Sequence, residues 1–372
     1  MSERQVLSLG KQAGSRGQRL RAAIGRRTDQ RAIILLLVVC IVALFVDTTV
    51  FTAYDATLSF IALTGLLALG LTAVILMGEL DLSIASILAV SGVVMASFDN
   101  LALGIVVALA SGVVIGIING FMVVKIGINS FIATLGTLFA LQGIAFVISD
   151  EQPVRIGNSQ EDVQAGLNFG KELIGSFTPR ILIFVLAFVL LHIFVSRVRA
   201  GREFYAVGGN RQAARDAGIP VNRRIFTGFM ISGFVAALGG VINTLELTTA
   251  DPTAGGTLLL VSFAAAIVGG NHLKGGRGSI FGTMIGVFAL GVMTVLLKFQ
   301  GVQVDIQQIF IGGVLLLAVI TDPASLRSVG QRIRVLFTES NKKVSAPEPL
   351  GSKADVEAAN AGGTPLQRKA DS

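Results

Sequence analysis

Long apolar stretches separated by short polar connections fill most of the chain. Ten of these stretches, several of them near 20 residues long, contain few or no charged residues. An α-helix needs about 20 apolar residues to cross the hydrocarbon core of a bilayer, so the pattern predicts an all-α polytopic membrane protein with about ten transmembrane helices. Some shorter stretches are expected to be half-helices or to tilt against their neighbours. The predicted spans are 32–47, 58–77, 82–98, 101–124, 128–148, 179–196, 226–247, 257–270, 279–298 and 306–321.

The polar connections differ in charge, and this difference predicts the side of the membrane that each one faces. Residues 1–31 carry eight Lys and Arg against two acids, and residues 197–224 carry seven Arg against two acids. Residues 149–178 carry five acids against two basic residues. Basic loops stay in the cytoplasm, so the N-terminal arm and 197–224 are predicted inside and 149–178 outside. Ten spans within 32–321 then return the tail 322–372 to the cytoplasm, where its composition predicts disorder from about residue 338.

The overall composition fits a membrane protein and narrows the possible partners. Hydrophobic residues make up 52% and charged residues 14% of the chain, whereas soluble proteins are about 25% charged. The net charge of +7 could indicate a nucleic-acid partner. The basic residues gather in segments that the orientation rule places inside, however, so we expect contact with the lipid bilayer and no nucleic acid. One cysteine and two distant histidines predict neither an intrachain disulfide nor a metal site.

Motifs for catalysis and nucleotide binding are missing from the sequence. The glycine-rich stretch 269–278 lacks the Gly-Lys-Ser/Thr ending of a phosphate-binding loop. Neither histidine has an obvious nucleophile partner. We therefore expect a protein that is not an enzyme and has no cofactor of its own, so that any use of ATP would need an ATPase on another chain.

Two carboxylates stand in the middle of an apolar region. Glu79 and Asp81 are the only charged residues within 56–98, and a carboxylate at the bilayer centre costs roughly 2.5–3.5 kcal/mol. A helix break at Gly78 would place both acids in a protein-lined turn. Asp81 would then be the N-cap of a helix that begins at Leu82, its carboxylate accepting N–H groups of the first turn.

Two roles are open for these acids. In the first, a bend in the wall of a transport pathway is formed and capped by Gly78, Glu79, Asp81 and Ser83. In the alternative, the chain is an ion-coupled secondary transporter in which Glu79, Asp81 or Glu246 binds a proton or a cation. A channel or scaffold subunit is a third possibility for a chain of this composition.

The basic loop 197–224 contains the pattern of a short helix. Asn210–Ile219 reads as a helix with Gly218 as its stop and Pro220 just beyond. Between two spans on the cytoplasmic side, such a helix can transmit motion from a partner to the membrane core. A solvated loop that only obeys the orientation rule is the simpler interpretation of the same charges.

Three blocks of sequence resemble a known family. They read GELDLSIAS at 78–86, GREFYAVGGNRQAARDAGI at 201–219, and DPTAG at 251–255 followed by IVGGNHLKGGRGS at 267–279. They are similar, in order and spacing, to blocks of the ribose-, xylose- and arabinose-type permeases of the branched-chain/ribose permease family, the membrane subunits of bacterial ABC sugar importers. Ala85, the absence of acids from 258–263, and the sequence of 271–274 depart from the family pattern and leave the sugar open.

The resemblance implies a type II-like importer fold in the bacterial inner membrane. It also implies a homodimer, an ATP-binding cassette subunit inside that binds the ATP, and an extracytoplasmic sugar-binding protein outside. The residues that carry the match for coupling to the ATPase are Gly208, Gly209, Asn210, Ala213, Ala214 and Gly218. A neutral sugar needs hydroxyl and amide partners, for which the candidates are Ser83, Ser86, Asn119, Thr134, Thr137 and Asn243, with the acid Glu246.

Overall fold

The computed structural model describes residues 32–157, 160–171 and 178–320. The predicted N-terminal arm, the tail and parts of the loop 149–178 lie outside the described residues. The described helices up to Ala318 belong to one compact unit of the chain.

Helices make up most of the described chain, as the apolar pattern predicts. Two two-residue strands, β1 (Val154–Arg155) and β2 (Thr249–Ala250), pair antiparallel with Val154 opposite Ala250. The helices in chain order are Ala32–Val46, α2 (Thr49–Thr52), α3 (Tyr54–Ile75), α4 (Ile84–Ala96), α5 (Leu101–Phe121), the π-helical turn η1 (Met122–Ile126), α6 (Ser130–Ser149), α7 (Gln160–Phe169), α8 (Pro179–Arg197), α9 (Arg199–Gly209), α10 (Arg211–Asp216), α11 (Val221–Leu247), α12 (Gly256–Val268), α13 (Ile280–Phe299) and α14 (Val304–Ile320).

Each of the ten predicted spans coincides with an apolar helix, but the helices differ in length. Six of those in the described residues are long and apolar enough to cross a membrane: α3, α5 with η1, α6, α8, α11 and α13. The other four, Ala32–Val46, α4, α12 and α14, are shorter apolar helices. The polytopic membrane character is therefore confirmed, while the count of about ten transmembrane helices stays a prediction.

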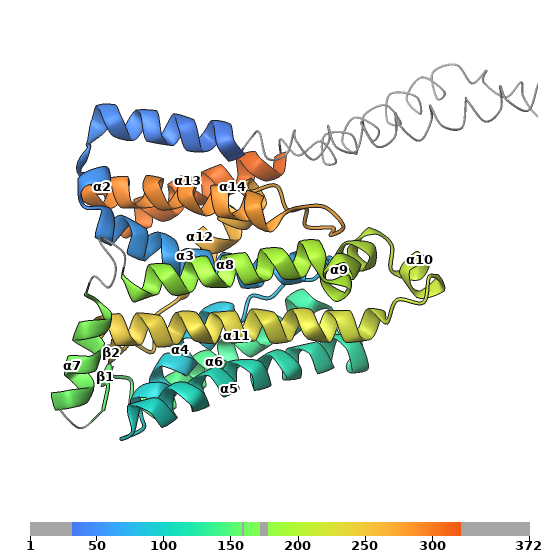
Figure 1. Ribbon diagram of the computed structural model, residues 1–372, viewed down its shortest axis with the longest axis horizontal. Coiled ribbons are helices and arrows are strands. Elements are labelled where there is room, and N and C mark those ends of the chain that lie inside the picture. The colour runs from blue at the N-terminus through green and yellow to red at the C-terminus, as the bar shows by residue number, and fades with distance from the viewer. Residues whose placement is uncertain (1–31, 158–159, 172–177, 321–372) are drawn as a thin grey trace, which may run out of the picture. The chain divides into compact units, whose positions relative to one another are not determined.

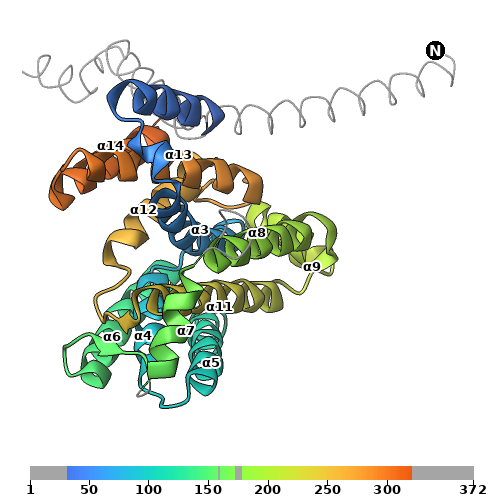
Figure 2. The same cartoon turned by 60° about the vertical axis from the view of Figure 1, so that its left-hand side comes forward.

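Helix α11 packs against α5, α3 and α4 at the centre of this unit (Figures 1 and 2). The crossing with α5 is close because both helices present glycine: a Cβ added at Gly116 would lie 2.4 Å from the carbonyl oxygen of Phe229, and one at Gly233 would lie 2.1 Å from that of Gly112. Small residues four apart on a membrane helix allow this approach of two backbones. The spacing of glycines along α5 thus positions α11.

The helical conformation is interrupted at two places within long apolar stretches. One break, residues 76–83, separates α3 from α4, and the other, residues 269–279, separates α12 from α13. The two pairs pack side by side, since α3 contacts both α12 and α13. Figure 1 shows α9 and α10 at one end of the long helices α8 and α11, and α7 with the strands at the opposite end.

Candidate functional site

The helix break predicted at Gly78 is present. Gly78 has φ +75°, a left-handed conformation that glycine adopts without steric cost. A Cβ at this position would also lie 2.9 Å from the carbonyl oxygen of Lys274. Residues 79–83 are not helical, so both acids of the apolar region belong to the break.

Asp81 is fully buried and surrounded by hydrogen-bond donors. Its Oδ1 accepts from the backbone N–H of Ser83 at 3.1 Å and from the Ser83 hydroxyl at 2.5 Å, and its Oδ2 accepts from the Ser232 hydroxyl of α11 at 2.7 Å. An ionised carboxylate can only accept, and these three donors satisfy it without a cation.

The predicted helix start at Leu82 and N-cap at Asp81 are wrong by two residues. Helix α4 begins at Ile84, and its N-cap residue is Ser83. The physical reason is that the carboxylate of Asp81 accepts from the amide two residues ahead, which closes a local turn that competes with the helix. It also accepts from Ser232 on another helix. Asp81 therefore ties the start of α4 to α11 and does not cap its first helical turn.

A chain of polar side chains continues from Asp81 into two further helices. The Asn119 amide of α5 donates to the Ser83 hydroxyl at 2.8 Å, and the Thr137 hydroxyl of α6 donates to Asn119 Oδ1 at 2.7 Å. One turn away on α6, the Thr134 hydroxyl accepts the N–H of Leu82 at 3.1 Å. Four of the predicted pathway residues thus meet at the break.

Two residues of this network, Ser130 and Ser232, were not predicted. The Ser130 hydroxyl accepts the N–H of Leu80 at 3.1 Å. Ser130 lies four residues before Thr134, on the same face of α6, so helical spacing could have identified it. No comparable signal marks Ser232, because its partner Asp81 lies 151 residues away in the sequence.

The remaining predicted pathway residues lie elsewhere. Ser86 donates its hydroxyl to the carbonyl of Ser83 at 2.9 Å, within the first turn of α4. Asn243 and Glu246 lie on α11, on the order of 16–21 Å along the helix from Ser232 at 1.5 Å per residue. These two do not belong to the network at the break.

Glu246 forms part of a charged group at the opposite end of the unit. Arg180, whose side chain is 3% exposed, places Nη1 2.7 Å from Glu246 Oε1 and Nη2 2.5 Å from Asp55 Oδ1. Glu246, a predicted pathway candidate, is thus a member of an ion-paired triad. Arg180 was missed by the sequence analysis, although an arginine at the first turn of a span on the predicted outer side is an exception to the orientation rule.

The three sequence blocks that carry the family resemblance meet at the break. The N–H of Gly276 donates to the carbonyl of Leu76 at 2.9 Å. A Cβ at Gly208 would lie 2.1 Å from the same carbonyl oxygen and 2.4 Å from Gly276 N, and one at Gly275 would lie 2.8 Å from Gly78 Cα. Only glycine permits backbones this close. The break, the basic loop and the 269–279 loop therefore form one backbone junction, which spacing along the chain did not predict.

The predicted short helix of the basic loop is confirmed as α10. Asn210 is its N-cap, with Oδ1 accepting the N–H of Ala213 at 3.0 Å. Gly218, with φ +75°, follows its C-terminus, as expected for a glycine stop. Ala214 is the only buried residue of α10, and Gly209 and Ala213 are exposed. The helix thus presents most of its surface outward.

A second helix in this loop, α9, was not predicted and is attached to α11 by an ion pair between Glu203 and Arg224. Glu203 of α9 is buried; its Oε1 lies 2.9 Å from Arg199 Nε and its Oε2 lies 2.5 Å from Arg224 Nε of α11. The hydrogen bond from Arg224, and then that from Arg199, holds the pKa of Glu203 below its usual value. On the other side, the Tyr205 hydroxyl donates to the carbonyl of Gly278 at 3.2 Å.

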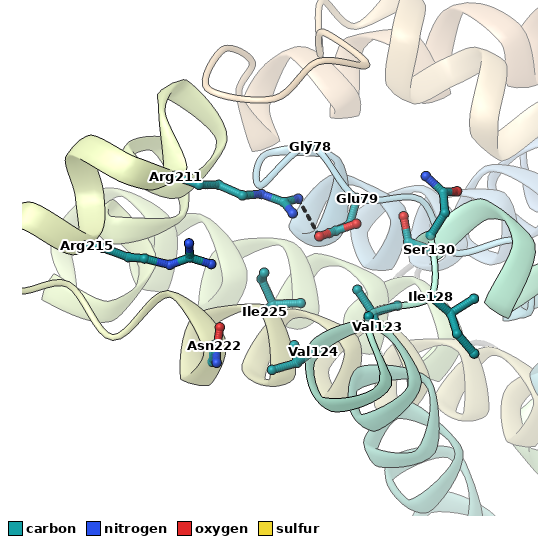
Figure 3. Close-up of a pocket in the computed structure, with 12 residues that line it drawn as sticks. Gly78, Glu79, Val123, Val124, Ile128, Ser130, Arg211, Arg215, Asn222 and Ile225 are labelled. Atoms are coloured by element: carbon teal, nitrogen blue, oxygen red, sulfur yellow. Dashed lines mark hydrogen bonds and ion pairs between the residues drawn. The ribbon is translucent and has the colours of Figure 1, made fainter.

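The second acid of the break, Glu79, is paired with the short helix α10. Glu79 is 4% exposed, and its Oε1 lies 2.5 Å from Nη2 of Arg211 (Figure 3). A cavity of about 390 Å³ adjoins this pair. The cavity is lined by Gly78, Glu79, Val123, Val124, Gly127, Ile128, Asn129, Ser130, Arg211, Arg215, Asn222 and Ile225.

Within the described residues, no group of three His, Cys, Asp or Glu side chains could hold a metal ion. The junction contains neutral hydroxyl and amide groups and two acids. Asp81 is hydrogen-bonded to serine hydroxyls, and Glu79 is paired with Arg211. Such groups bind neutral polar molecules or fix backbone positions.

Comparison with known proteins gives one family. The family described as "Branched-chain amino acid transport system / permease component" matches residues 53–319. The chain is 38% identical over 272 residues to a ribose import permease protein of Bacillus subtilis, covering 70% of this chain and 82% of that protein. It is 35% identical over 304 residues to the ribose import permease protein of Escherichia coli K12, covering 79% and 93%.

A third relative is the L-arabinose transport system permease protein of Escherichia coli K12, which is 32% identical over 321 residues, covering 83% of this chain and 95% of that protein. No solved structure matches the chain. The resemblance carried by the three blocks is confirmed at the level of the family. The relatives of this chain include ribose and arabinose permeases. The chain belongs to the family of branched-chain amino acid transport system permease components.

Proposed function

We propose that this chain is the membrane-spanning permease subunit of an ATP-driven importer and carries a monosaccharide across the inner membrane of a bacterium. In this proposal it has a type II-like importer fold and works as a homodimer. An ATP-binding cassette subunit binds the ATP on the cytoplasmic side, and an extracytoplasmic protein delivers the sugar. Both termini and the loop 197–224 face the cytoplasm.

The single observation that carries the proposal is the glycine junction of Gly78, Gly208 and Gly275. It joins the basic loop directly to the break before α4, without intervening flexible side chains. Close-packed backbones transmit displacement because they cannot be compressed. A partner that moves α10 would therefore move the break, which is the step that an ATP-driven permease requires.

The chemistry of the break supports a neutral cargo. Ser83, Asn119, Thr134 and Thr137 present hydroxyl and amide groups beside the break, and these match the hydroxyl groups of a sugar. Relatives are named as ribose, D-allose and L-arabinose permeases. D-Ribose, D-allose and L-arabinose are therefore the sugars with which to begin.

The alternative of an ion-coupled secondary transporter is disfavoured by the pairing of its candidate residues. Glu79 is paired with Arg211, and Glu246 is paired with Arg180. Asp81 accepts three hydrogen bonds. Each of the three carboxyl groups therefore already has partners on this chain, which a transported proton or cation would have to displace.

Reconstitution tests the two functions against each other. Proteoliposomes would contain the purified chain, with or without the ATPase encoded by a neighbouring gene, and the binding protein would be added outside. We expect uptake of at least one of the three labelled sugars only when the ATPase and hydrolysable ATP are both present. Accumulation driven by a proton gradient in vesicles without the ATPase would exclude the importer and favour the secondary transporter.

Orientation is tested by labelling single cysteines in a Cys40→Ala background. Gln160 begins α7 and Ala213 lies in α10, and both are exposed. An impermeant maleimide should label cysteine at position 160 in intact spheroplasts and cysteine at position 213 only in inverted vesicles. The reverse result would overturn the proposed topology.

A further inference from the structure

We infer that Glu79 is a positioning residue that couples the movement of α10 to the break before α4 through its ion pair with Arg211. The inference rests on the proposed function, since it concerns how work done on the basic loop reaches the pathway. The sequence predicted only that Glu79 is part of a bend in the pathway wall.

The pair joins a buried group to an exposed one. Glu79 lies in the break and is 4% exposed, whereas the side chain of Arg211 is 45% exposed, on a helix whose one buried residue is Ala214. A buried carboxylate that loses its cation is left uncompensated, which is strongly unfavourable. Glu79 and α10 are therefore expected to move together.

The Glu79–Arg211 pair has a cavity on one side and close-packed backbone on the other. The cavity of about 390 Å³ beside the pair leaves α10 unpacked on that side, between η1 and the starts of α6 and α11 (Figure 3). On the other side, Gly208 just before α10 touches Leu76 and Gly276. The cavity thus leaves room for α10 to move toward η1, and the close-packed glycine backbones at Gly208 transmit that movement to the break.

Two residues beyond Glu79, the break is tied to the helices that surround the polar network. Asp81 binds Ser232 of α11 and, through Ser83, reaches Asn119 of α5. A displacement of Glu79 therefore changes the positions of groups on α4, α5 and α11 together. An interaction that merely anchored α10 to the body of the protein would not need to end in this segment.

The experiment compares Glu79→Gln, Arg211→Gln and the double variant in the reconstituted importer. The measured quantity is the number of sugar molecules imported per ATP hydrolysed, with the sugar from the three-member panel that the wild-type protein transports. Each single variant is expected to bind the ATPase and hydrolyse ATP while this ratio falls at least about fivefold. The double variant should be no worse than either single variant, because residues that act through one interaction are not additive.

Two further variants act as controls. Arg215→Gln removes the same charge one turn further along α10, from a side chain that is exposed and lines the same cavity. Arg215→Gln should import as many sugar molecules per ATP hydrolysed as the wild type, even if it binds the ATPase more weakly. Arg211→Lys should keep most of the ratio, since a single N–O contact joins the pair and Lys supplies the same charge.

Protein abundance and thermal midpoint are measured for every variant. If Arg211→Gln does not fold because it leaves Glu79 uncompensated, Glu79→Gln and the double variant, which leave no unpaired acid, still provide the test. A wild-type ratio in Glu79→Gln would overturn the inference, as would additive losses in the double variant or a loss explained by reduced ATPase binding. Failure of the wild-type protein to import any of the three sugars with ATP would instead contradict the proposed function.

Discussion

The side-chain amide of Asn119 on α5 donates a hydrogen bond to the hydroxyl of Ser83, with Nδ2 2.8 Å from Oγ. Both groups are fully buried. This contact fixes the start of α4 against α5, and Ser83 in turn donates to Asp81. The polar network at the break is therefore continuous from α6 to α11, and each of its members can be tested by removing one hydrogen bond.

Replacing Asn119 by Leu should destabilise the protein by about 1–3 kcal/mol, because the hydroxyls of Ser83 and Thr137 each lose a buried partner. Thr137→Val should cost less, since it removes one side-chain hydrogen bond and Asn119 keeps its contact with Ser83. Thermal unfolding of the detergent-solubilised variants measures the difference. Equal midpoints for the wild type and Asn119→Leu would show that the network does not contribute to stability.

Asp81 should tolerate replacement by Asn better than replacement by Ala. Asn keeps an acceptor for Ser83, and the hydroxyl of Ser232 can rotate to accept from the new amide. Ala leaves Ser232 buried without that partner and should cost about 1–3 kcal/mol, with most of the transport lost. ATP-dependent uptake at equal membrane abundance is the measurement. A proton carrier would behave differently, because Asn cannot titrate and would be as inactive as Ala.

Replacing Arg180 by Met should be destabilising, by about 1–3 kcal/mol, because it leaves the partly buried Glu246, whose side chain is 29% exposed, without its cation. Adding Glu246→Gln should recover part of this loss. Asp55→Asn should have a small effect, since Asp55 is 56% exposed and exposed pairs contribute little. Glu246→Gln alone should retain transport with an unchanged pH profile. Abolished transport in this variant would support ion coupling through Glu246.

Glu203 should make the stability of the protein dependent on pH in the acid range. Its pKa is lowered in the folded state by Arg224 and Arg199, so its contribution is fully present above the ordinary pKa of about 4.3. The contribution is lost as the pH falls through the lowered folded pKa.

The thermal midpoint of the wild type should therefore exceed that of Glu203→Gln at pH 7, and the gap should narrow progressively below about pH 4.3. Arg199→Gln is the milder control, because Arg199 is 84% exposed and Arg224 only 21%. A gap that is constant with pH would show that the charge of Glu203 is not what stabilises this contact.

The crossing of α5 and α11 should not tolerate a larger side chain at Gly116. A Cβ there would lie 2.4 Å from the carbonyl oxygen of Phe229. Overpacking typically lowers the free energy of unfolding by about 1–3 kcal/mol, and Gly116→Leu should exceed this range. Gly136 of α6 has nothing within 4 Å of an added Cβ, and Gly136→Leu is the matched control that should fold normally. Fluorescence-detected size-exclusion chromatography distinguishes the two outcomes. A monodisperse, fully abundant Gly116→Leu variant would contradict this account of the crossing.

The sequence by itself determined the class of the protein, the approximate positions of its apolar helices and two of its irregular points. Apolar runs, charged loops and glycine stops act over a few residues, so the positions of the ten apolar helices, the break at Gly78 and the stop at Gly218 could be predicted without knowing any tertiary contact. The start of α4 was misplaced because Asp81 satisfies two serines, of which only Ser83 is local.

Only the tertiary structure decided which polar groups meet. Arg211 and Glu79 are 132 residues apart, and Asn119 and Ser83 are 36 residues apart; their pairing depends on how α5, α10 and the break pack in space. Hydrophobic burial places helices but does not choose between the many hydroxyls and charges they carry. For Arg211 and Glu79 that choice follows from the close glycine contacts at 78, 208 and 275, because a buried polar group must find its partner within the few ångströms that such packing leaves.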